Sequence, residues 1–211
     1  MNLFNFRREY TKGKLDESNV EPSPIDQFRK WFIDAVKKHE IEPNAMTIAT
    51  ATRDGSPSAR IVLMKEFSER GFTFFTCFNS KKGVHLSENH YAALVFYWPK
   101  LERQVRIEGR VEKLQSHESD KYFESRPEGS KIAATLSEQS HLIEDKKAFD
   151  ELFEKTLKEN KGKKIARPSA WGGYLVKPYL VEFWQGRPNR LHDRIQYHFD
   201  GEKWKIRRLT P

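Results

Sequence analysis

Near the C-terminus, residue types that bind anions and transfer protons are concentrated in the run Trp184-Gln185-Gly186-Arg187-Pro188-Asn189-Arg190-Leu191-His192-Asp193-Arg194. If residues 190–199 form a strand, its side chains alternate between two faces. Arg190, His192 and Arg194 then share one face, whereas the other face is mostly apolar. Neighbouring cationic groups repel one another unless an anion lies among them. The run therefore predicts one wall of a site for a phosphorylated or otherwise anionic ligand; a solvated basic strand face is the alternative.

A second candidate is the run Arg60-Ile61-Val62-Leu63-Met64-Lys65, which has a cationic residue at each end of an apolar stretch. A basic side chain within an otherwise buried strand needs a counter-charge. An anionic ligand can supply that charge, and so can a structural carboxylate. The sequence of this segment leaves both interpretations open.

Two further segments contain groups suited to phosphate. Ser80-Lys81-Lys82-Gly83 offers a hydroxyl, two ammonium groups and free backbone N–H groups at a predicted helix start. Tyr122 and Arg126 are four residues apart on a predicted helix, and Ser130 follows them. The alternatives are a solvated lysine turn for the first segment and ordinary helix termination before Pro127 for the second.

Gln104, in the run Leu101-Glu102-Arg103-Gln104-Val105-Arg106, is a candidate for binding a heteroaromatic ring edge, because an amide both donates and accepts hydrogen bonds. An exposed cross-strand pair is the alternative. The seven histidines include no HxxxH spacing or His/Cys cluster, so no metal site is expected. Rossmann, P-loop and nucleophile-elbow motifs are also lacking.

The composition indicates one globular domain in a chain of 211 residues with a formal net charge of +8. Fifteen Phe, five Trp and seven Tyr argue against disorder, and the positive charge favours anionic partners. The single cysteine, Cys77, excludes an internal disulfide and suits a reducing compartment. Because neither a membrane span nor a signal-peptide core is evident, we expect a soluble cytoplasmic protein.

The elements that must position these residues are mostly strands. A helix is predicted to begin with Ser23 as N-cap and Pro24 in its first turn, with an apolar stripe that includes Phe28 and Trp31. Residues 1–22 are expected to be extended or mobile. Strands are predicted over residues 45–52, 58–67, 72–78, 91–98, 102–114, 174–184, 190–199 and 203–209. Helices are predicted over 82–89, 116–125 and 143–159, the last with Phe149, Leu152, Phe153, Thr156 and Leu157 as its buried stripe. This order predicts a small β-barrel with added helices.

Together these segments resemble the pyridoxine (pyridoxamine) 5′-phosphate oxidases, flavoenzymes of vitamin B6 metabolism. The resemblance runs from Arg7 to the C-terminus. Its strongest parts are Arg7-Arg8-Glu9-Tyr10, residues 60–65, Leu101-Glu102-Arg103-Gln104-Val105, Ser125-Arg126-Pro127 and Asn189-Arg190-Leu191-His192-Asp193-Arg194. Each motif is weak alone, but their order over this length is not expected by coincidence.

The resemblance implies a mainly β fold with α-helices: an FMN-binding split β-barrel with peripheral helices. It implies a homodimer with two FMN sites at the subunit interface. Residues 23–211 would form the single domain, and residues 1–22 a mobile segment that acts as the active-site lid. The implied reaction is the oxidation of pyridoxamine 5′-phosphate and pyridoxine 5′-phosphate by dioxygen. Its products would be pyridoxal 5′-phosphate and hydrogen peroxide, with ammonia released from the amine.

The resemblance also implies roles for individual residues. Flavin contacts from one chain would be Arg60, Ile61, Val62, Leu63, Met64, Lys65, Phe75, Thr76, Lys81, Lys82 and Gln104. The partner chain would add Gln139, Ser140, Trp184 and Arg194. The substrate would contact Lys65, Tyr122, Arg126, Ser130, Arg190, Leu191 and His192, with Arg7, Arg8, Glu9 and Tyr10 as the lid. Arg190 and His192 would be the catalytic residues. Lys81 departs from the arginine usual in the family, so bidentate phosphate binding is not expected there.

Two other classes of protein remain as alternatives. One is a related split-barrel flavoprotein that oxidises another substrate; the Tyr122, Arg126 and Ser130 group argues against it. The other is a basic nucleic-acid-binding module. The basic residues occur in short separate motifs mixed with acids, and no RNP-like or zinc-finger pattern is present. Neither a nucleic-acid nor a membrane partner is therefore expected.

Overall fold

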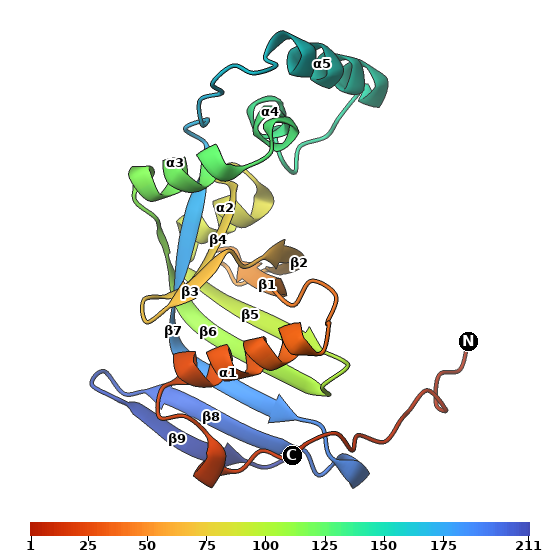
Figure 1. Ribbon diagram of the computed structural model, residues 1–211, viewed down its shortest axis with the longest axis vertical. Helices are drawn as coiled ribbons and strands as arrows, with labels where there is room; N and C mark the ends of the chain where they lie inside the picture. The colour runs from red at the N-terminus through yellow and green to blue at the C-terminus, as the bar shows by residue number, and fades with distance from the viewer.

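The computed structural model describes residues 1–211 and consists of one nine-stranded antiparallel sheet with helices around it (Figure 1). The strands are β1 (Ala45–Ala51), β2 (Pro57–Leu63), β3 (Glu66–Ser68), β4 (Gly71–Cys77), β5 (Tyr91–Trp98), β6 (Arg103–Lys113), β7 (Trp171–Gln185), β8 (Asp193–Phe199) and β9 (Trp204–Leu209). The α-helices are α1 (Pro24–Lys37), α2 (Lys81–Glu88), α3 (Ser116–Ser125), α4 (Glu128–Leu136) and α5 (Lys146–Glu159). Two short 3₁₀ helices are η1 (Glu17–Asn19) and η2 (Pro188–Arg190).

The sheet has the strand order β2-β1-β5-β6-β7-β4-β3 and curls into a barrel. Near the end of β2, the Lys65 N–H donates to the carbonyl of Thr73 in β4 at 2.8 Å, which brings the two ends of this order together. The long strand β7 pairs with β4 through its first half and with β8 through its second half. The hairpin β8–β9 therefore extends the sheet beyond the barrel, at the lower end in Figure 1.

Helix α1 begins where the sequence predicts it to begin. The Ser23 hydroxyl accepts the N–H of Ile25 at 3.2 Å, and Pro24 occupies the first turn. The inner side of the helix buries Phe28 and Trp31 against the sheet. Phe28 lies at the centre of the core, with ring centroids 4.9–5.9 Å from those of Phe32, Phe67, Phe72, Phe96 and Trp98.

The strand predicted over residues 190–199 is wrong at its start. Asn189 and Arg190 have φ of 55° and 61°, and they belong to the 3₁₀ helix η2, which begins at Pro188. Strand β8 begins only at Asp193, so Arg190 and His192 are turn residues and not members of an alternating face. The alternation holds from Arg194 onward, because Ile195 and Tyr197 are buried in the core.

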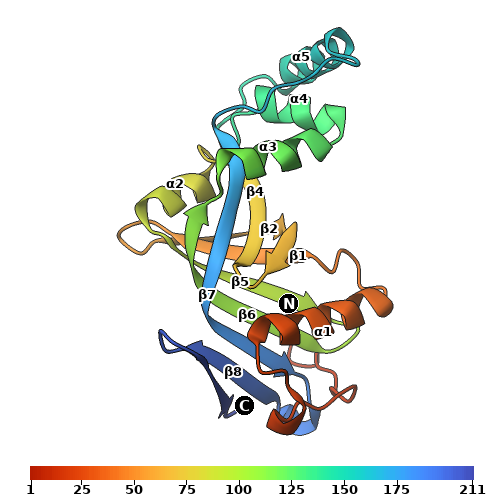
Figure 2. The ribbon, with the colours of Figure 1, turned by 60° about the vertical axis from the view of Figure 1, so that its left-hand side comes forward.

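The helices on the other side of the barrel differ from the prediction in two ways. Helix α4 was not predicted, because residues 128–136 combine a glycine and small residues with no clear apolar stripe. The apolar side chains of α5 were predicted to be buried, but none is, and Leu152 is exposed. Helix α5 packs on α4, where Phe153 lies against Gly129, and it does not reach the barrel (Figure 2).

Residues 1–22 were predicted to be a mobile segment, but part of this segment packs against the domain. Leu15 is 6% exposed and belongs to the core. The Tyr197 hydroxyl donates to the carbonyl of Glu21 at 2.6 Å. Residues 1–9, in contrast, are exposed. None of the helices has the length and apolar character needed to cross a membrane.

Replacing Phe28 with alanine is expected to lower the free energy of unfolding by about 3–5 kcal/mol, because it leaves a cavity among the surrounding rings. Ile33→Ala on the outer side of α1, where Ile33 is 45% exposed, should change it by about 0.5 kcal/mol or less. Urea unfolding of both variants measures the difference. Equal losses would show that α1 does not pack through Phe28.

Candidate functional site

A cavity of about 700 Å³ lies between β2, β4 and the helices α2, α3 and α4. Its wall contains four cationic residues and no aspartate or glutamate among 19 lining residues. The cationic residues are Arg60, Lys65, Lys82 and Arg126. A cavity with this charge attracts anions, because nothing in its wall neutralises the cations.

Arg60 has only neutral hydrogen-bond partners. Its Nη1 donates to Thr50 Oγ1 at 2.8 Å and to the Ser58 carbonyl at 3.1 Å. Its Nη2 donates to Ser58 Oγ at 2.7 Å. Burial lowers the pKa of the guanidinium. The counter-charge that the sequence left open is therefore not a carboxylate of this chain.

Lys82 is the buried cation in the first turn of α2. Its Nζ donates to Thr76 Oγ1 at 3.1 Å, to Ser80 Oγ at 3.3 Å and to Gln139 Oε1 at 3.1 Å. Burial lowers the pKa of Lys82, and repulsion from Arg60 lowers it further. Since the two cations lie near enough to repel each other, an anion between them would be attracted by both. Lys81 is exposed and does not line the cavity.

Arg126 is the third partly buried cation, and its Nη1 is buried without a hydrogen-bond partner. Its guanidinium lies 4.6 Å from the centroid of Trp171, and burial lowers its pKa. Tyr122 stacks on Phe75 at 4.0 Å, and Lys65 Nζ lies 5.9 Å from the Tyr122 ring. An unpartnered N–H on a buried cation is costly, so this atom is suited to donate to an anionic group.

The predicted substrate-phosphate residues therefore lie in one place. Lys65, Tyr122, Arg126 and Ser130 all line the same cavity as Arg60 and Lys82. Ser130 reaches it because it lies in the first turn of α4. Of the other predicted flavin residues, Ile61, Val62, Leu63, Phe75, Thr76 and Gln139 also line it. Met64 is buried in the core, and Ser140 is exposed.

A second cavity, of about 950 Å³, lies at the end of β7 and beneath the N-terminal segment. Tyr10 makes edge-on contacts with Trp184 and His192, at centroid distances of 5.6 and 5.7 Å. Asn189 donates its N–H to Glu9 Oε2 at 3.2 Å. The predicted residues that line this cavity are Arg7, Arg8, Glu9, Tyr10, Trp184, Arg190 and His192. Leu191 is 66% exposed.

His192 is held as a neutral imidazole. Its Nδ1 lies 3.1 Å from the backbone N–H of Arg187, and an N–H can only donate, so Nδ1 accepts. Burial lowers the pKa of His192, and nearby Arg190 lowers it further, whereas Asp193 acts in the opposite direction. With Nδ1 engaged, Nε2 carries the proton and is the atom available to a ligand.

Arg194 is fixed by a buried acid. Glu182, whose side chain is 4% exposed, accepts from Arg194 Nε at 2.9 Å and from Nη2 at 3.1 Å. Arg106 also approaches Glu182, at 3.4 Å. The two-point contact fixes the plane of the Arg194 guanidinium. Sequence reasoning missed Glu182, although its position two residues before Trp184 places both on one strand face.

Within one chain, the sheet register and the side-chain contacts show which of the predicted flavin residues lie together. Gln104 is opposite Trp184 in the register of β6 and β7, and Trp184 is opposite Arg194 in β8. Gln104 therefore lies in a row with Trp184 and Arg194, on the outer face of the sheet. Gln139, predicted to come from the partner chain, instead contacts Lys82 of its own chain. This grouping depends on strand register, which the motifs alone do not specify.

One chain thus contains two separate cationic surfaces. The first, which we call the upper cavity, is the one lined by Arg60, Lys82 and Arg126. The second, the lower cavity, is the one lined by Arg190 and His192. Helices α3 and α4, which contribute to the upper cavity, lie at the opposite end of the molecule from the end of β7, which contributes to the lower one (Figures 1 and 2). The two cavities share no lining residue.

Solved structures share this architecture over nearly the whole chain. PhzG from Burkholderia lata 383, in complex with tetrahydrophenazine-1-carboxylic acid, superposes with a TM-score of 0.89 at 31% identity, covering 94% of this chain and 98% of that one. A pyridoxamine 5′-phosphate oxidase-related, FMN-binding protein from Nostoc punctiforme has a TM-score of 0.72 at 16% identity, with 91% and 100% covered. The fold is the split β-barrel of this class of proteins, and the predicted fold class is confirmed.

Sequence comparison gives the family. The family model described as pyridoxamine 5′-phosphate oxidase matches residues 32–157, and the pyridoxine 5′-phosphate oxidase C-terminal dimerisation region matches residues 171–211. Relatives named pyridoxine/pyridoxamine 5′-phosphate oxidase include those of a Cyanothece species, 47% identical over 100% of this chain and 99% of its own, and of Burkholderia multivorans, 53% identical over 99% of each. The chain belongs to the pyridoxamine 5′-phosphate oxidase family, so the resemblance seen in the motifs is confirmed.

The environment of His192 predicts that its imidazole titrates below the ordinary histidine value of about 6.5. Desolvation and Arg190 both disfavour the charged form, and protonating Nδ1 would break its contact with the Arg187 N–H. NMR titration of the histidine ring protons measures the midpoint, with His192→Gln used to assign the signal. A midpoint at or above 6.5 would contradict this environment.

Proposed function

We propose that this protein oxidises pyridoxamine 5′-phosphate and pyridoxine 5′-phosphate to pyridoxal 5′-phosphate, with FMN as cofactor and dioxygen as electron acceptor. The observation that carries the proposal is the upper cavity, in which four cations face an interior without a single carboxylate. FMN and the proposed substrates both carry phosphate groups, which supply the missing negative charge.

The cations of the upper cavity fall into two groups, which suits two phosphoesters. Arg60 and Lys82 are close enough to depress the pKa of the lysine, and hydroxyls of Ser58, Thr76 and Ser80 surround them. We assign this group to FMN. Arg126, with its unpartnered Nη1, lies with Lys65, Tyr122 and Ser130 around the same cavity. We assign this second group to the substrate phosphate.

FMN would supply the acceptor for the hydride that leaves the substrate, and the protein supplies binding and orientation. Arg190 would orient the substrate ring and stabilise negative charge that develops on it. Neutral His192 presents its Nε2–H as a donor at the same surface. Tyr10, in contact with both Trp184 and His192, would exclude water from above.

A complete site then needs two chains, because the upper and lower cavities are separated within one chain. Residues 171–211 match the family's C-terminal dimerisation region, which supports a homodimer. The outer sheet face, with Gln104, Trp184 and Arg194 in one row, is available for that contact. We propose that the lower cavity of one chain faces the upper cavity of the other.

A second candidate function is the oxidation of a different, unphosphorylated substrate, as suggested by the likeness to PhzG bound to tetrahydrophenazine-1-carboxylic acid. The two functions differ in their need for a second phosphate group. Arg126 with its unpartnered Nη1 favours the phosphorylated substrate. Comparing pyridoxamine 5′-phosphate with pyridoxamine as substrates discriminates between them, because only the first should be turned over efficiently.

The direct test is to purify the protein, record its absorbance for bound flavin, and add pyridoxamine 5′-phosphate in air while measuring hydrogen peroxide. The expected result is a yellow protein that forms peroxide and pyridoxal 5′-phosphate in equal amounts. A colourless protein that takes up no added FMN and forms no product would reject the proposal.

Arg60→Ala should weaken FMN binding about 10- to 100-fold, because charge-assisted hydrogen bonds to the phosphate are lost. Fluorescence titration of the apoprotein with FMN measures this. Arg53→Ala, which removes an exposed arginine from the β1–β2 turn, is the matched control and should leave FMN affinity unchanged. Equal effects of the two substitutions would mean that Arg60 does not contact the cofactor.

Arg190→Ala should lower kcat about 100-fold or more, with little change in FMN content, because Arg190 acts on the reacting ring. Steady-state kinetics and flavin absorbance, measured on the same preparation, separate the two effects. Loss of FMN in proportion to activity would show that Arg190 only builds the cofactor site.

A further inference from the structure

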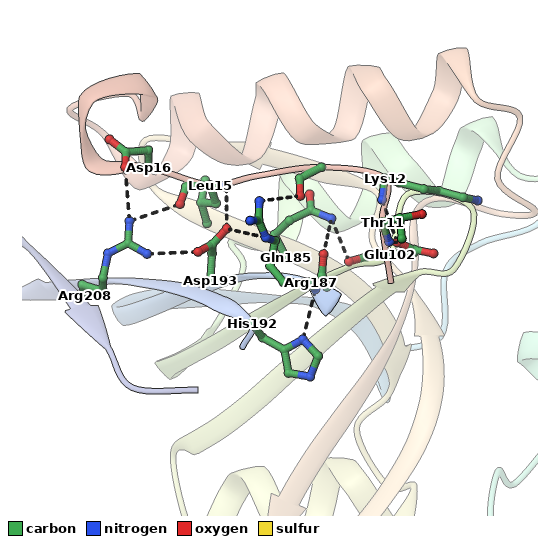
Figure 3. Close-up of polar contacts among 12 residues, drawn as sticks. Thr11, Lys12, Leu15, Asp16, Glu102, Gln185, Arg187, His192, Asp193 and Arg208 are labelled. Atoms are coloured by element: carbon green, nitrogen blue, oxygen red, sulfur yellow. Dashed lines mark hydrogen bonds and ion pairs between the residues drawn. The ribbon is translucent and has the colours of Figure 1, made fainter. Parts of the chain in front are cut away.

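The N-terminal chain crosses the domain between the loop before β6 and the start of β8. Figure 3 shows residues 11–15, which we call the anchor segment, passing over Glu102, Gln185 and Asp193. The anchor segment belongs to no strand or helix, so its place is set by side-chain contacts instead of a backbone ladder. It directly follows the residues that cover the lower cavity.

One of these contacts is the carboxylate of Glu102. Its Oε2 accepts the backbone N–H of Thr11 at 2.7 Å and that of Lys12 at 3.0 Å, and Arg8 lies 3.4 Å from Oε1. The Glu102 side chain is 3% exposed. Backbone N–H groups and one partly exposed arginine are thus the main compensation for a buried charge.

The backbone of Glu102 is itself held firmly. Its carbonyl accepts the Gly186 N–H at 2.8 Å and Gln185 Nε2 at 3.2 Å. Its φ of 56° lies in the left-handed region, which a non-glycine residue adopts only at a cost in free energy. The fold retains this conformation, and it aims the carboxylate at the anchor segment.

The other contact is the carboxylate of Asp193. Its Oδ2 accepts the Leu15 N–H at 3.0 Å, and its Oδ1 lies 3.2 Å from Arg208. Arg208 also donates to the Leu15 carbonyl at 3.2 Å, and Arg187 donates to the Gly13 carbonyl at 3.3 Å. The anchor segment is therefore bound at both of its ends.

Close approaches fix the register of the chain between these contacts. A Cβ on Gly13 would lie 2.6 Å from Gln185 Oε1, and a Cβ on Gly186 would lie 2.7 Å from the Tyr10 ring. Only glycine fits at either position without displacing a neighbour. Shifting the segment by one residue would put Lys12 or Lys14 against Gln185, which the spacing does not allow.

We propose that Glu102 and Asp193 are positioning residues that clamp the anchor segment, so that residues 7–10 are held over Arg190 and His192. Apart from the ring contacts of Tyr10 with Trp184 and His192, residues 7–10 make few contacts with the domain. These are Arg8 with the Pro99 carbonyl at 3.1 Å and with Glu102, and Glu9 with Asn189. A fixed anchor keeps this short cover near its site and lowers the entropy cost of closing it. The role in catalysis rests on the proposed function, whereas the clamp itself does not.

The test is Glu102→Ala, examined by hydrogen exchange, limited trypsin digestion and kinetics. We expect fast exchange at the Thr11 and Lys12 amides, with β5 and β6 still protected, and faster cleavage after Lys12. We also expect the KM for pyridoxamine 5′-phosphate to rise about tenfold, with a smaller change in kcat and normal FMN content. Glu102→Gln, which keeps one carbonyl oxygen as acceptor, should restore much of the protection.

Asp200→Asn is the matched control, because the Asp200 carboxylate also accepts two backbone N–H groups, those of Glu202 and Lys203, both at 3.0 Å. It lies in the β8–β9 turn and should change neither the exchange at Thr11 and Lys12 nor the KM. Asp193→Ala provides a second variant of the clamp and should release the Leu15 amide, because it removes the acceptor of its N–H.

Three results would overturn the proposal. The first is slow exchange at Thr11 and Lys12 in Glu102→Ala, and the second is a loss of protection spread equally over the whole sheet. The third is a released anchor segment with an unchanged KM. Exchange and digestion need no turnover, so a wild-type protein without oxidase activity would reject the proposed function and still leave the clamp open to these measurements.

Discussion

The candidate site depends on buried positive charge that no acidic residue in its wall neutralises. Burying a cation without an acidic partner is costly. The upper cavity contains three partly or fully buried cations, Arg60, Lys82 and Arg126, and no acidic residue lines it. Hydroxyl and carbonyl oxygens reduce the cost without removing the charge, as Thr50 and Ser58 do for Arg60. Thr50 and Ser58 are opposite each other in the register of β1 and β2, so strand pairing itself aims the guanidinium.

Strand β7 connects the two cavities. Its first residue, Trp171, lines the upper cavity beside Arg126, and Trp184 near its other end lines the lower one. Because one continuous strand holds both, the separation between the cavities is built into the sheet and does not depend on loops. A rigid separation suits a site assembled from two chains, in which each upper cavity must meet a lower cavity at a fixed place.

Most of the strands and the start of α1 could be predicted, because they depend on local signals such as alternation and capping. The residues that line the upper cavity were predicted mainly from the family resemblance. The sequence did not predict α4, whose apolar contacts are few, or the η2 turn, whose positive φ values at Asn189 and Arg190 depend on the surrounding structure. The sequence also did not predict that Gln104 lies beside Trp184, because only the sheet register brings the two together. The contact of Glu102 with the N-terminal segment could not be predicted, because its partners are backbone N–H groups far away in the sequence.

The pairing of β4 with β7 has a consequence for how the protein is made. Strands β1 to β4 leave the ribosome early, but β4 finds its main partner only after all of α2 to α5 has been synthesised. Until then the edge of β4 that pairs with β7 has no strand partner, and Phe74 lacks the ring of Tyr174 on which it stacks in the folded protein. Non-local pairing of this kind slows folding and exposes nascent chains to aggregation. The barrel can close only when β7 arrives, so chaperone protection should matter most while the residues between β4 and the end of β7 are being translated.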